Sequence, residues 1–285
     1  MILIVDSGST KTDWIALDDN GNEIFSTKTL GLNPQMLSNE ILNERIKNNF
    51  DIYKNRELVE KLYFYGAGCG VKSTKDRILK VFKSIFINCK FDIKEDTYAA
   101  VYSAVDIGKP SIVNIIGTGS NCSYYDGENV IQKVHSLGYV LMDYASGNYF
   151  GKYLIRAYYF NKMPEKLREK FSESYDLSPN SIKNSLYREE NPNTYLAGFA
   201  KFLIDNKSNE YFKEIIFKGL ERFIEYQILQ YDDFSKVDIH YVGSIGYYLR
   251  DEIIKIGNKY NLQTGRFIQR PITGLVNYHK RNILN

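Results

Sequence analysis

The chain begins with three short predicted strands joined by tight turns, and the same order of elements returns about 110 residues further on. Residues 1–25 contain an apolar strand, a turn of small residues at 6–12 and two more strands. Residues 111–131 repeat this order around a second turn at 117–121, and both turns are rich in residues that accept positive φ or cap themselves. A repeat of this length is too long for a solenoid and predicts a duplicated domain, with chance similarity of two hairpins as the alternative.

Predicted helices alternate with strands between the two hairpins, which indicates an α/β layer architecture. From residue 147 to residue 230 the pattern is mainly helical, and a last strand at 239–242 then leads into Gly243. A length of 285 residues fits two modest domains. Because no linker rich in Pro, Ser or Gly separates the halves, we expect the boundary near residue 106 to be a tight hinge.

Charge and composition argue against several classes of function. The net charge of +3 is spread along the chain, and runs such as Lys72–Lys83 alternate cations with apolar residues, as a solvated helix face does. We therefore expect no nucleic-acid partner. No apolar run approaches the roughly 20 residues that span a bilayer, and the N-terminus has no targeting character, so we expect no membrane partner and a cytoplasmic location. The three cysteines form no C-x-x-C pair, which indicates neither a disulfide framework nor a zinc site.

The first small-residue turn carries groups that suit a phosphate tail. Residues 6–12 place a carboxylate, a flexible glycine and several hydroxyl groups at the end of a strand. The glycine lets the backbone approach a ligand closely, and the amides and side chains around it can bind phosphate oxygens. Asp6 can hold Mg²⁺ through water molecules. The alternative is an ordinary hydrogen-bonded hairpin turn. The predicted phosphate-binding residues of this turn are Gly8, Ser9, Thr10 and Lys11.

The second turn has the same properties at the equivalent place in the repeat, and two such turns, one from each half, would grip one polyphosphate from both sides. Other nucleotide motifs are not found in the sequence. Residues 66–73 are similar to a P-loop but have Val71 where that motif needs glycine, and no G-x-G-x-x-G follows a strand. The predicted phosphate-binding residues of the second turn are Gly117, Thr118, Gly119 and Ser120.

Together with the turn after the last strand, these turns resemble the two phosphate motifs and the adenosine motif of the actin-like ATPase superfamily, which includes sugar kinases and actin. Within this superfamily, the chain resembles the N-acetylglucosamine kinase and BadF/BadG-type ATPase family. The segments that carry the resemblance follow the family's order over almost the whole chain: 31–34, 65–69, 116–121, 242–245 and 271–276.

The resemblance implies an α/β chain of two RNase H-like domains, with ATP and Mg²⁺ in a cleft between them. It also implies closure of the domains on a small sugar substrate, which would exclude competing water. The first domain would comprise residues 1–105, completed by a C-terminal helix at about 272–285. The second would comprise residues 106–271 and contain a helical insertion. A homodimer stays open as an alternative to a monomer.

Site residues are also implied by the resemblance. Asp96 matches the family's catalytic aspartate, the base that accepts the proton of the sugar hydroxyl, although an Asp directly before a helix is also a favoured N-cap. Asn33 matches a sugar-binding residue, whereas its place before Pro34 also suits a turn. Sugar contacts are further implied for Gly68 and Asp143, and a nucleotide contact for Gly243.

One segment departs from the family pattern. Where the family has Gly-Asp-Glu-Gly-Ser-Gly, residues 142–147 read Met-Asp-Tyr-Ala-Ser-Gly, so that Asp143 is kept while two glycines and a glutamate are lost. A Met and a Tyr in the acceptor pocket would change its shape and remove a carboxylate that can bind a sugar hydroxyl. The main hypothesis remains ATP-dependent phosphorylation of an amino sugar, with N-acetylglucosamine as the first candidate.

Two other functions stay open. An ATPase of the same fold would activate a partner enzyme through an iron–sulfur cluster, but such a cluster needs closely placed thiolates, and Cys69, Cys89 and Cys122 are scattered in the sequence. A sensor that binds nucleotide or sugar without transferring phosphate would explain the altered segment at 142–145. Turnover separates a kinase from a sensor, because a sensor would be stabilised by its ligand without releasing ADP.

Overall fold

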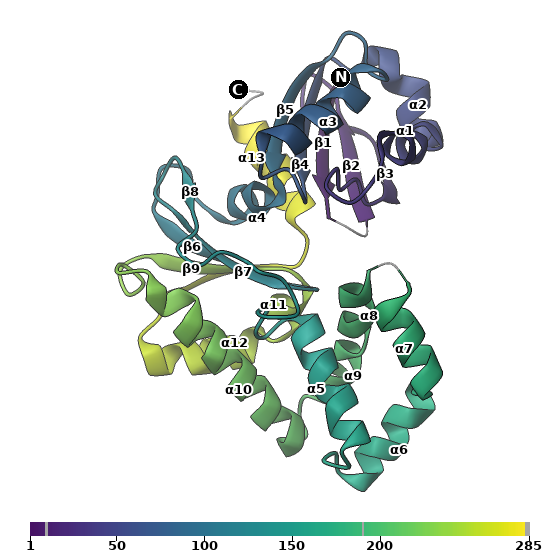
Figure 1. Cartoon of the computed structure of the whole chain (residues 1–285). Coiled ribbons are helices and arrows are strands. Elements are labelled where there is room, and N and C mark those ends of the chain that lie inside the picture. Colours follow the sequence, from purple (N-terminus) through teal and green to yellow (C-terminus); the bar gives the residue numbers. More distant parts are fainter. Residues whose placement is uncertain (9–10, 190, 283–285) are drawn as a thin grey trace. The chain divides into compact units, whose positions relative to one another are not determined.

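The chain folds into two compact units, which Figure 1 shows in a computed structural model. The structure describes residues 1–8, 11–189 and 191–282. Unit 1 consists of Met1–Asp106 and Arg270–Asn285, and unit 2 consists of Ile107–Gln269. Unit 2 is therefore an insertion in the sequence of unit 1.

Unit 1 contains a mixed sheet of five strands in the spatial order β3 (Glu23–Leu30), β2 (Lys11–Leu17), β1 (Ile2–Ser7), β4 (Lys61–Gly66) and β5 (Lys90–Glu95). The central strand β1 is antiparallel to β2 and parallel to β4. β2 and β3 are antiparallel, and β4 and β5 are parallel. Tight turns suffice for the antiparallel pairs, whereas the parallel pairs need crossover connections, which helices supply here.

Helices cover both faces of the unit 1 sheet. Buried side chains of α1 (Asn39–Lys47), α2 (Phe50–Asn55) and α3 (Lys72–Lys83) form one apolar core with the sheet, and those of α4 (Asp96–Ala104) and α13 (Pro271–Asn282) form a second. A short 3₁₀ helix, η1 (Arg56–Leu58), follows α2. Successive side chains of a strand point to opposite faces, so Leu3 lies in the first core and Ile4 in the second. Burial on both faces explains the continuous apolar run at the N-terminus.

The sheet of unit 2 repeats that of unit 1. Its spatial order is β8 (Val130–Ile131), β7 (Ser120–Tyr125), β6 (Ser111–Ile116), β9 (Asp238–Val242) and β10 (Thr264–Ile268). β6 is antiparallel to β7 and parallel to β9, β7 is antiparallel to β8, and β9 is parallel to β10. Order and direction agree with unit 1, strand for strand. The predicted α/β fold of two related RNase H-like units is therefore confirmed.

One large apolar core holds the helices of unit 2 to its sheet. Fully buried aromatic rings from separate helices meet in it, including Phe150, Phe171 and Phe212. In the described parts of the chain, no helix is both long and apolar enough to cross a membrane. The helices are α5 (Gly147–Tyr159), α6 (Glu165–Ser174), α7 (Pro179–Tyr187), α8 (Pro192–Gly198), α9 (Ala200–Asp205), α10 (Glu210–Tyr226), η2 (Ile228–Gln230), α11 (Ser244–Tyr248), α12 (Arg250–Gly257) and η3 (Asn258–Tyr260).

Candidate active site

The carboxyl ends of three parallel strands bring several predicted residues of unit 1 to one edge of its sheet. In the register of the sheet, Ser7 lies beside Gly66, and Gly66 lies beside Glu95. The carbonyl oxygen of Ser7 accepts a hydrogen bond of 2.8 Å from the N–H of Ala67. The turn after β1, the segment after β4 and the start of α4 are therefore neighbours. This edge is where α/β sheets commonly bind ligands.

The turn between β1 and β2 is closed by backbone and hydroxyl contacts. The N–H of Gly8 donates to the carbonyl oxygen of Lys11 at 3.0 Å. The hydroxyls of Ser7 and Thr12 share a hydrogen bond of 2.7 Å, and Ser7 Oγ also accepts a bond of 3.0 Å from the N–H of Leu32. The turn is thus tied to the segment predicted to bind the sugar. Two predicted phosphate-binding residues lie outside the described residues: Ser9 and Thr10.

The carboxyl group of Asp6 lies beside this turn, close to two other carboxylates. Asp6 and Asp13 are opposite each other in the register of β1 and β2. Burial raises the pKa of Asp6 to about 7, and the charges of Asp96 and Asp13 add to this rise. Arg270 donates to Asp13 at 2.5 Å, and Lys11 Nζ lies 3.6 Å from the same carboxyl group. Asp13 therefore has cationic partners, whereas Asp6 keeps its proton until the pH approaches 7.

Asp96 is the first residue of α4, and Glu95 occupies the N-cap position without a side-chain capping bond. The carboxylate of Asp96 accepts hydrogen bonds from the N–H groups of Thr97 and of Asp96 itself, which favours the ionised form. Burial opposes this effect and, with the charge of Glu95, raises the pKa of Asp96 to about 6. The predicted N-cap position is thus shifted by one residue, although Asp96 still satisfies N–H groups of the first turn.

Asn33 and Gly68, both predicted to bind the sugar, are packed against each other. Gly68 has a φ of +77°, and a Cβ on it would lie 2.1 Å from Asn33 Oδ1, so only glycine fits. Asn33 is buried, and its Oδ1 accepts a hydrogen bond of 2.9 Å from the N–H of Gln35. This bond is the turn role that the sequence left open. Both residues belong to the edge described above, because Leu32 contacts Ser7 there.

Two arginines hold the backbone of residues 31–37, which we call the acceptor loop. Arg77 on α3 donates to the carbonyl oxygens of Pro34 at 2.5 Å and Leu37 at 2.7 Å. Arg45 on α1 donates to the carbonyl oxygen of Gly31. A guanidinium group carries five N–H donors in one plane, so a single side chain can hold two carbonyls at once. The loop that carries the predicted sugar ligand is thereby held from two helices.

In unit 2, the turn after β6 lies against the starts of two helices. The N–H groups of Gly147 and Asn148, in the first turn of α5, donate to the carbonyl oxygens of Gly117 and Thr118 at 2.8 and 3.0 Å. Gly243 directly precedes α11 and has a φ of +113°. A Cβ on Gly243 would lie 2.6 Å from a carbonyl oxygen of β6, so the backbone can approach this closely only at glycine. Three segments far apart in the sequence thus meet at the second turn.

Asp143 lies against the same turn and is buried. Its Oδ2 accepts a hydrogen bond of 2.8 Å from Asn148 Nδ2, and a Cβ on Gly119 would come within 2.7 Å of that oxygen. The hydroxyl of Ser120 donates to the carbonyl oxygen of Tyr144 at 2.8 Å. The residues predicted to bind phosphate at this turn and the aspartate predicted to bind sugar are therefore in contact within unit 2.

A solved structure from Porphyromonas gingivalis, of a protein with the provisional name N-acetylglucosamine kinase, is similar to this chain over its full length. The two share 30% sequence identity, the match covers 99% of each chain, and the TM-score is 0.92. The chain belongs to the N-acetylglucosamine kinase family of actin-like ATPases.

More distant structures share the fold of this kinase family. A Chromobacterium violaceum protein with the same provisional name is 16% identical, with a TM-score of 0.71 and coverage of 97% of this chain and 98% of that chain. A ROK family glucokinase from Streptomyces griseus, solved in complex with glucose and AMPPNP, is 14% identical, with a TM-score of 0.54 and coverage of 97% of each chain. No protein-family model and no curated protein matches the chain.

The segment that departs from the pattern of the N-acetylglucosamine kinase family places its tyrosine on the core of unit 2. The ring centroid of Tyr144 lies 5.5 Å from that of Tyr149 and 5.3 Å from that of Tyr226. The side chain packs against the apolar core, whereas the carboxylate of Asp143 contacts the turn. Within unit 2, Tyr144 therefore packs between α5 and α10, and it does not displace Asp143 from the second turn.

Several residues that shape this kinase-family site were not predicted from the sequence: Asp13, Arg45, Arg77, Asn148 and Arg270. A signal existed for Asp13, because a charged residue inside a strand that is otherwise apolar indicates a buried partner. No local signal points to the arginines, since their acceptors lie on other elements and, for Arg270, near the opposite end of the chain.

Proposed function

We propose that this chain transfers the terminal phosphoryl group of ATP to a hydroxyl of an N-acetylated amino sugar. The observation that carries the proposal is the environment of Asp96, a carboxyl group with a pKa of about 6. It lies at the sheet edge that also holds the turn after β1 and the acceptor loop, in a chain of a sugar kinase family. The glucokinase relative was solved with glucose and AMPPNP, which supports a sugar and an adenine nucleotide as the two substrates.

The phosphates of ATP are assigned to the two small-residue turns in this proposal. Backbone N–H groups and hydroxyls at such turns donate to phosphate oxygens. The first turn would contribute Gly8 and Lys11 together with Ser9 and Thr10, and the second the run from Gly117 to Ser120. Gly243 would contribute to nucleotide binding, since its close approach to β6 places the start of α11 at the second turn.

The carboxylates of unit 1 suit a magnesium ion that is bound through water. Within the described residues, no group of three Asp, Glu, His or Cys side chains is placed as a set of metal ligands. Magnesium in phosphoryl-transfer enzymes is commonly held by one or two carboxylates together with substrate phosphates. Asp6 fits this role, because its ionised form is opposed by Asp96 and Asp13 and a cation would relieve that repulsion. The bound ion would neutralise negative charge on the phosphates.

Asp96 is the general base of the proposed reaction. A base is most effective when its pKa lies near the working pH, and a pKa of about 6 leaves Asp96 largely ionised at neutral pH. Its carboxylate would accept the proton of the acceptor hydroxyl as that oxygen attacks the phosphorus. Asn33 and Asp143 would hold the sugar, with Gly68 leaving room beside Asn33. N-acetylglucosamine is the first candidate acceptor.

The experiment is a coupled ADP-release assay with ATP and Mg²⁺ and a panel of acceptors. The panel contains N-acetylglucosamine, N-acetylmannosamine, N-acetylmuramic acid, glucosamine, glucose and a sample without sugar. We expect turnover that depends on an N-acetylated sugar. ADP release at the same rate in every sample would identify an ATPase, and stabilisation by ATP or sugar without ADP release would identify a sensor.

The cysteines bear on the alternative that this chain is an ATPase activator, which would activate a partner enzyme through an iron–sulfur cluster. Burial raises the pKa of Cys69 and of Cys89 to about 12. Among the described residues, no three His, Cys, Asp or Glu side chains are grouped as metal ligands, whereas a cluster needs closely placed thiolates. We expect protein purified without oxygen to be colourless and free of iron. A stoichiometric iron content would favour the activator over the kinase.

A further inference from the structure

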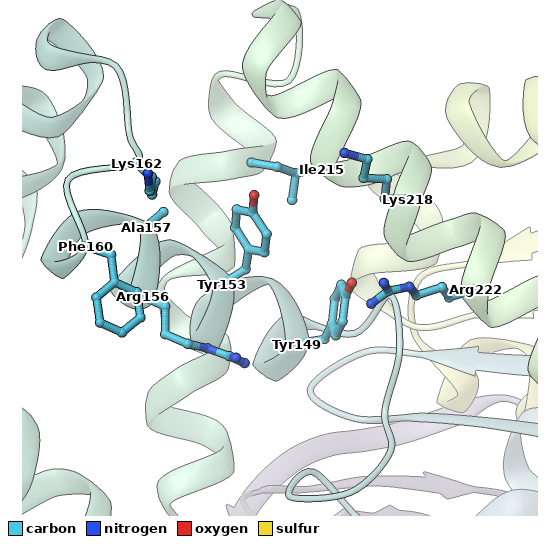
Figure 2. A pocket seen from close by; sticks show the side chains of 9 residues that line it. All are labelled: Tyr149, Tyr153, Arg156, Ala157, Phe160, Lys162, Ile215, Lys218 and Arg222. Atoms are coloured by element: carbon cyan, nitrogen blue, oxygen red, sulfur yellow. The ribbon is translucent and has the colours of Figure 1, made fainter.

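A groove of about 450 Å³ lies between α5 and α10 of unit 2, on residues that the proposed kinase reaction does not use (Figure 2). Tyr149, Tyr153, Arg156 and Phe160 line it from α5 and its C-terminal end. Their spacing of three or four residues places them on one side of that helix. The facing side of α10 contributes Ile215 and two cations. The volume is within the range of small-molecule sites.

The charged side chains that line this groove are all positive. Arg156, Lys162, Lys218 and Arg222 line it, and its described lining contains no Asp or Glu. Lys218 forms an ion pair of 2.5 Å with Glu214, one turn earlier on α10. In the part of the chain that the structure describes, no carboxylate forms a salt bridge with the other three. Four cations with one counter-charge create a positive potential that an anion would relieve.

The groove also offers a hydroxyl donor and apolar surface. Figure 2 shows the guanidinium group of Arg222 beside the hydroxyl of Tyr149 and the ring of Tyr153 between the two helices. Burial raises the pKa of Tyr149, an effect that Arg222 only partly opposes, so the phenol stays protonated and can donate. The rings, with Ile215, form walls that suit the face of a sugar or a base.

We propose that this groove is a binding site for a small organic phosphate, with the phosphate among its cations and a sugar or nucleoside ring against the tyrosines. A phosphate dianion matches the excess of positive charge, and guanidinium groups bind phosphate oxygens in pairs. A carboxylate would carry only one negative charge, whereas the phosphate dianion carries two. The second turn is not part of this lining: α5 hydrogen-bonds that turn through the N–H groups of Gly147 and Asn148, whereas the groove begins at Tyr149.

The test follows the methyl signal of Ile215 by NMR in the full-length chain with labelled isoleucine methyl groups, assigned with an Ile215→Val variant. Glucose 6-phosphate, adenosine monophosphate, inorganic phosphate and glucose are titrated separately. We expect a saturable shift with at least one of the two ring-bearing phosphates, about tenfold weaker binding of inorganic phosphate and no shift with glucose. Affinity should fall as salt increases, because the cations are exposed. Tighter binding of glucose 6-phosphate would identify the ligand as a sugar phosphate, and tighter binding of adenosine monophosphate would identify it as a nucleotide.

Variants separate this groove from every other phosphate site of the chain. An Arg156→Ala/Arg222→Ala variant should bind the ring-bearing phosphate at least tenfold more weakly. Lys166→Ala/Lys170→Ala, which removes two exposed cations from α6, is the matched control and should bind as the unmodified chain does. Equal affinity in both variants would overturn the proposal, as would inorganic phosphate binding as tightly as either ester, or no shift at all. None of these readouts uses kinase turnover, so the proposed function can fail without affecting the result.

Discussion

Asp6 and Asp96 lie at one edge of the unit 1 sheet, and the pKa of each is raised first by burial and then by a neighbouring carboxylate. Their partners differ. Asp96 accepts N–H groups at the start of α4, whereas the strongest neighbours of Asp6 are other acidic groups. Carboxyl groups whose surroundings differ in this way can take different roles in one site. Two predictions at this scale separate the proposed base from the proposed magnesium ligand.

The first prediction concerns the base. Asp96→Asn should keep ATP binding and lose turnover by about 10²-fold or more, because the amide cannot accept the proton. In the unmodified enzyme, kcat/KM should decrease as the pH falls through about 6, since protonation of Asp96 removes the base. The measurement is a pH profile of ADP release between pH 5 and 8. A variant with unmodified turnover would remove Asp96 from the role of base.

The second prediction concerns stability. The folded-state pKa of Asp6, about 7, is above its ordinary value of 3.8, so its contribution to stability is present below pH 3.8 and is lost as the pH rises through 7. Asp6→Asn should therefore raise the free energy of unfolding at pH 8, by up to ~4 kcal/mol for a shift of about three pKa units, and much less at pH 5. Urea denaturation in buffer with a chelator measures this difference.

Asp13→Asn is the matched control for that experiment. It removes the neighbouring carboxylate, which has Arg270 and Lys11 as partners, and should not stabilise the chain at pH 8. If Asp6→Asn and Asp13→Asn changed the stability alike at both pH values, the environment assigned to Asp6 would be wrong.

At the scale of elements, the acceptor loop has no regular secondary structure of its own and is shaped by the helices beside it. Arg45 and Arg77 reach its carbonyl oxygens from α1 and α3, and Gly68 packs on Asn33 from the segment after β4. A loop that is held in this way can keep a sugar ligand in place without paying for its ordering when the substrate binds.

Arg77→Met should therefore raise the KM for the sugar about tenfold and leave the KM for ATP unchanged, because the loop loses two of its backbone contacts while the small-residue turns are untouched. The loss of these hydrogen bonds should lower stability by about 1–2 kcal/mol. Steady-state kinetics with both substrates varied measures the effect. Lys80→Met, on an exposed position of the same helix, is the control. An equal rise in both KM values would contradict a role limited to the acceptor loop.

At the scale of the whole molecule, each unit has a core of its own, and the chain enters and leaves unit 2 through single connections. α13 completes unit 1 although it is the last helix of the sequence, because Ile272 and Leu275 are buried with residues of β1 and α4. Local stability should therefore follow the units and not the order of the sequence.

Leu275→Ala in unit 1 and Leu220→Ala in unit 2 test this expectation, since both side chains are almost completely buried. Each should cost about 2–5 kcal/mol through lost burial and the cavity left behind. Hydrogen exchange read by mass spectrometry should show weaker protection in β1 and β4 for Leu275→Ala, and in β6 and β9 for Leu220→Ala. Equal loss of protection in both units for either variant would show that the chain unfolds as one body.

The repeated order of strands and turns was enough to predict a duplicated α/β fold, because strand periodicity and turn chemistry are local properties. The resemblance of a few short segments then led to the family, which the Porphyromonas gingivalis structure supports. β10 was not predicted, since its burial is only intermediate and its alternation is weak. The assigned roles of Asp96, Asn33 and Asp143 remain predictions.

Tertiary structure alone decided which charges and carbonyls meet. Arg270 pairs with Asp13, and Arg77 reaches Pro34, only because sheet pairing and helix packing bring separate parts of the chain together. The same holds for the raised pKa values of Asp6 and Asp96, which depend on burial and on neighbours that local sequence does not specify. Sequence therefore determined the elements and their turns, whereas packing determined the chemistry of the groups at their ends.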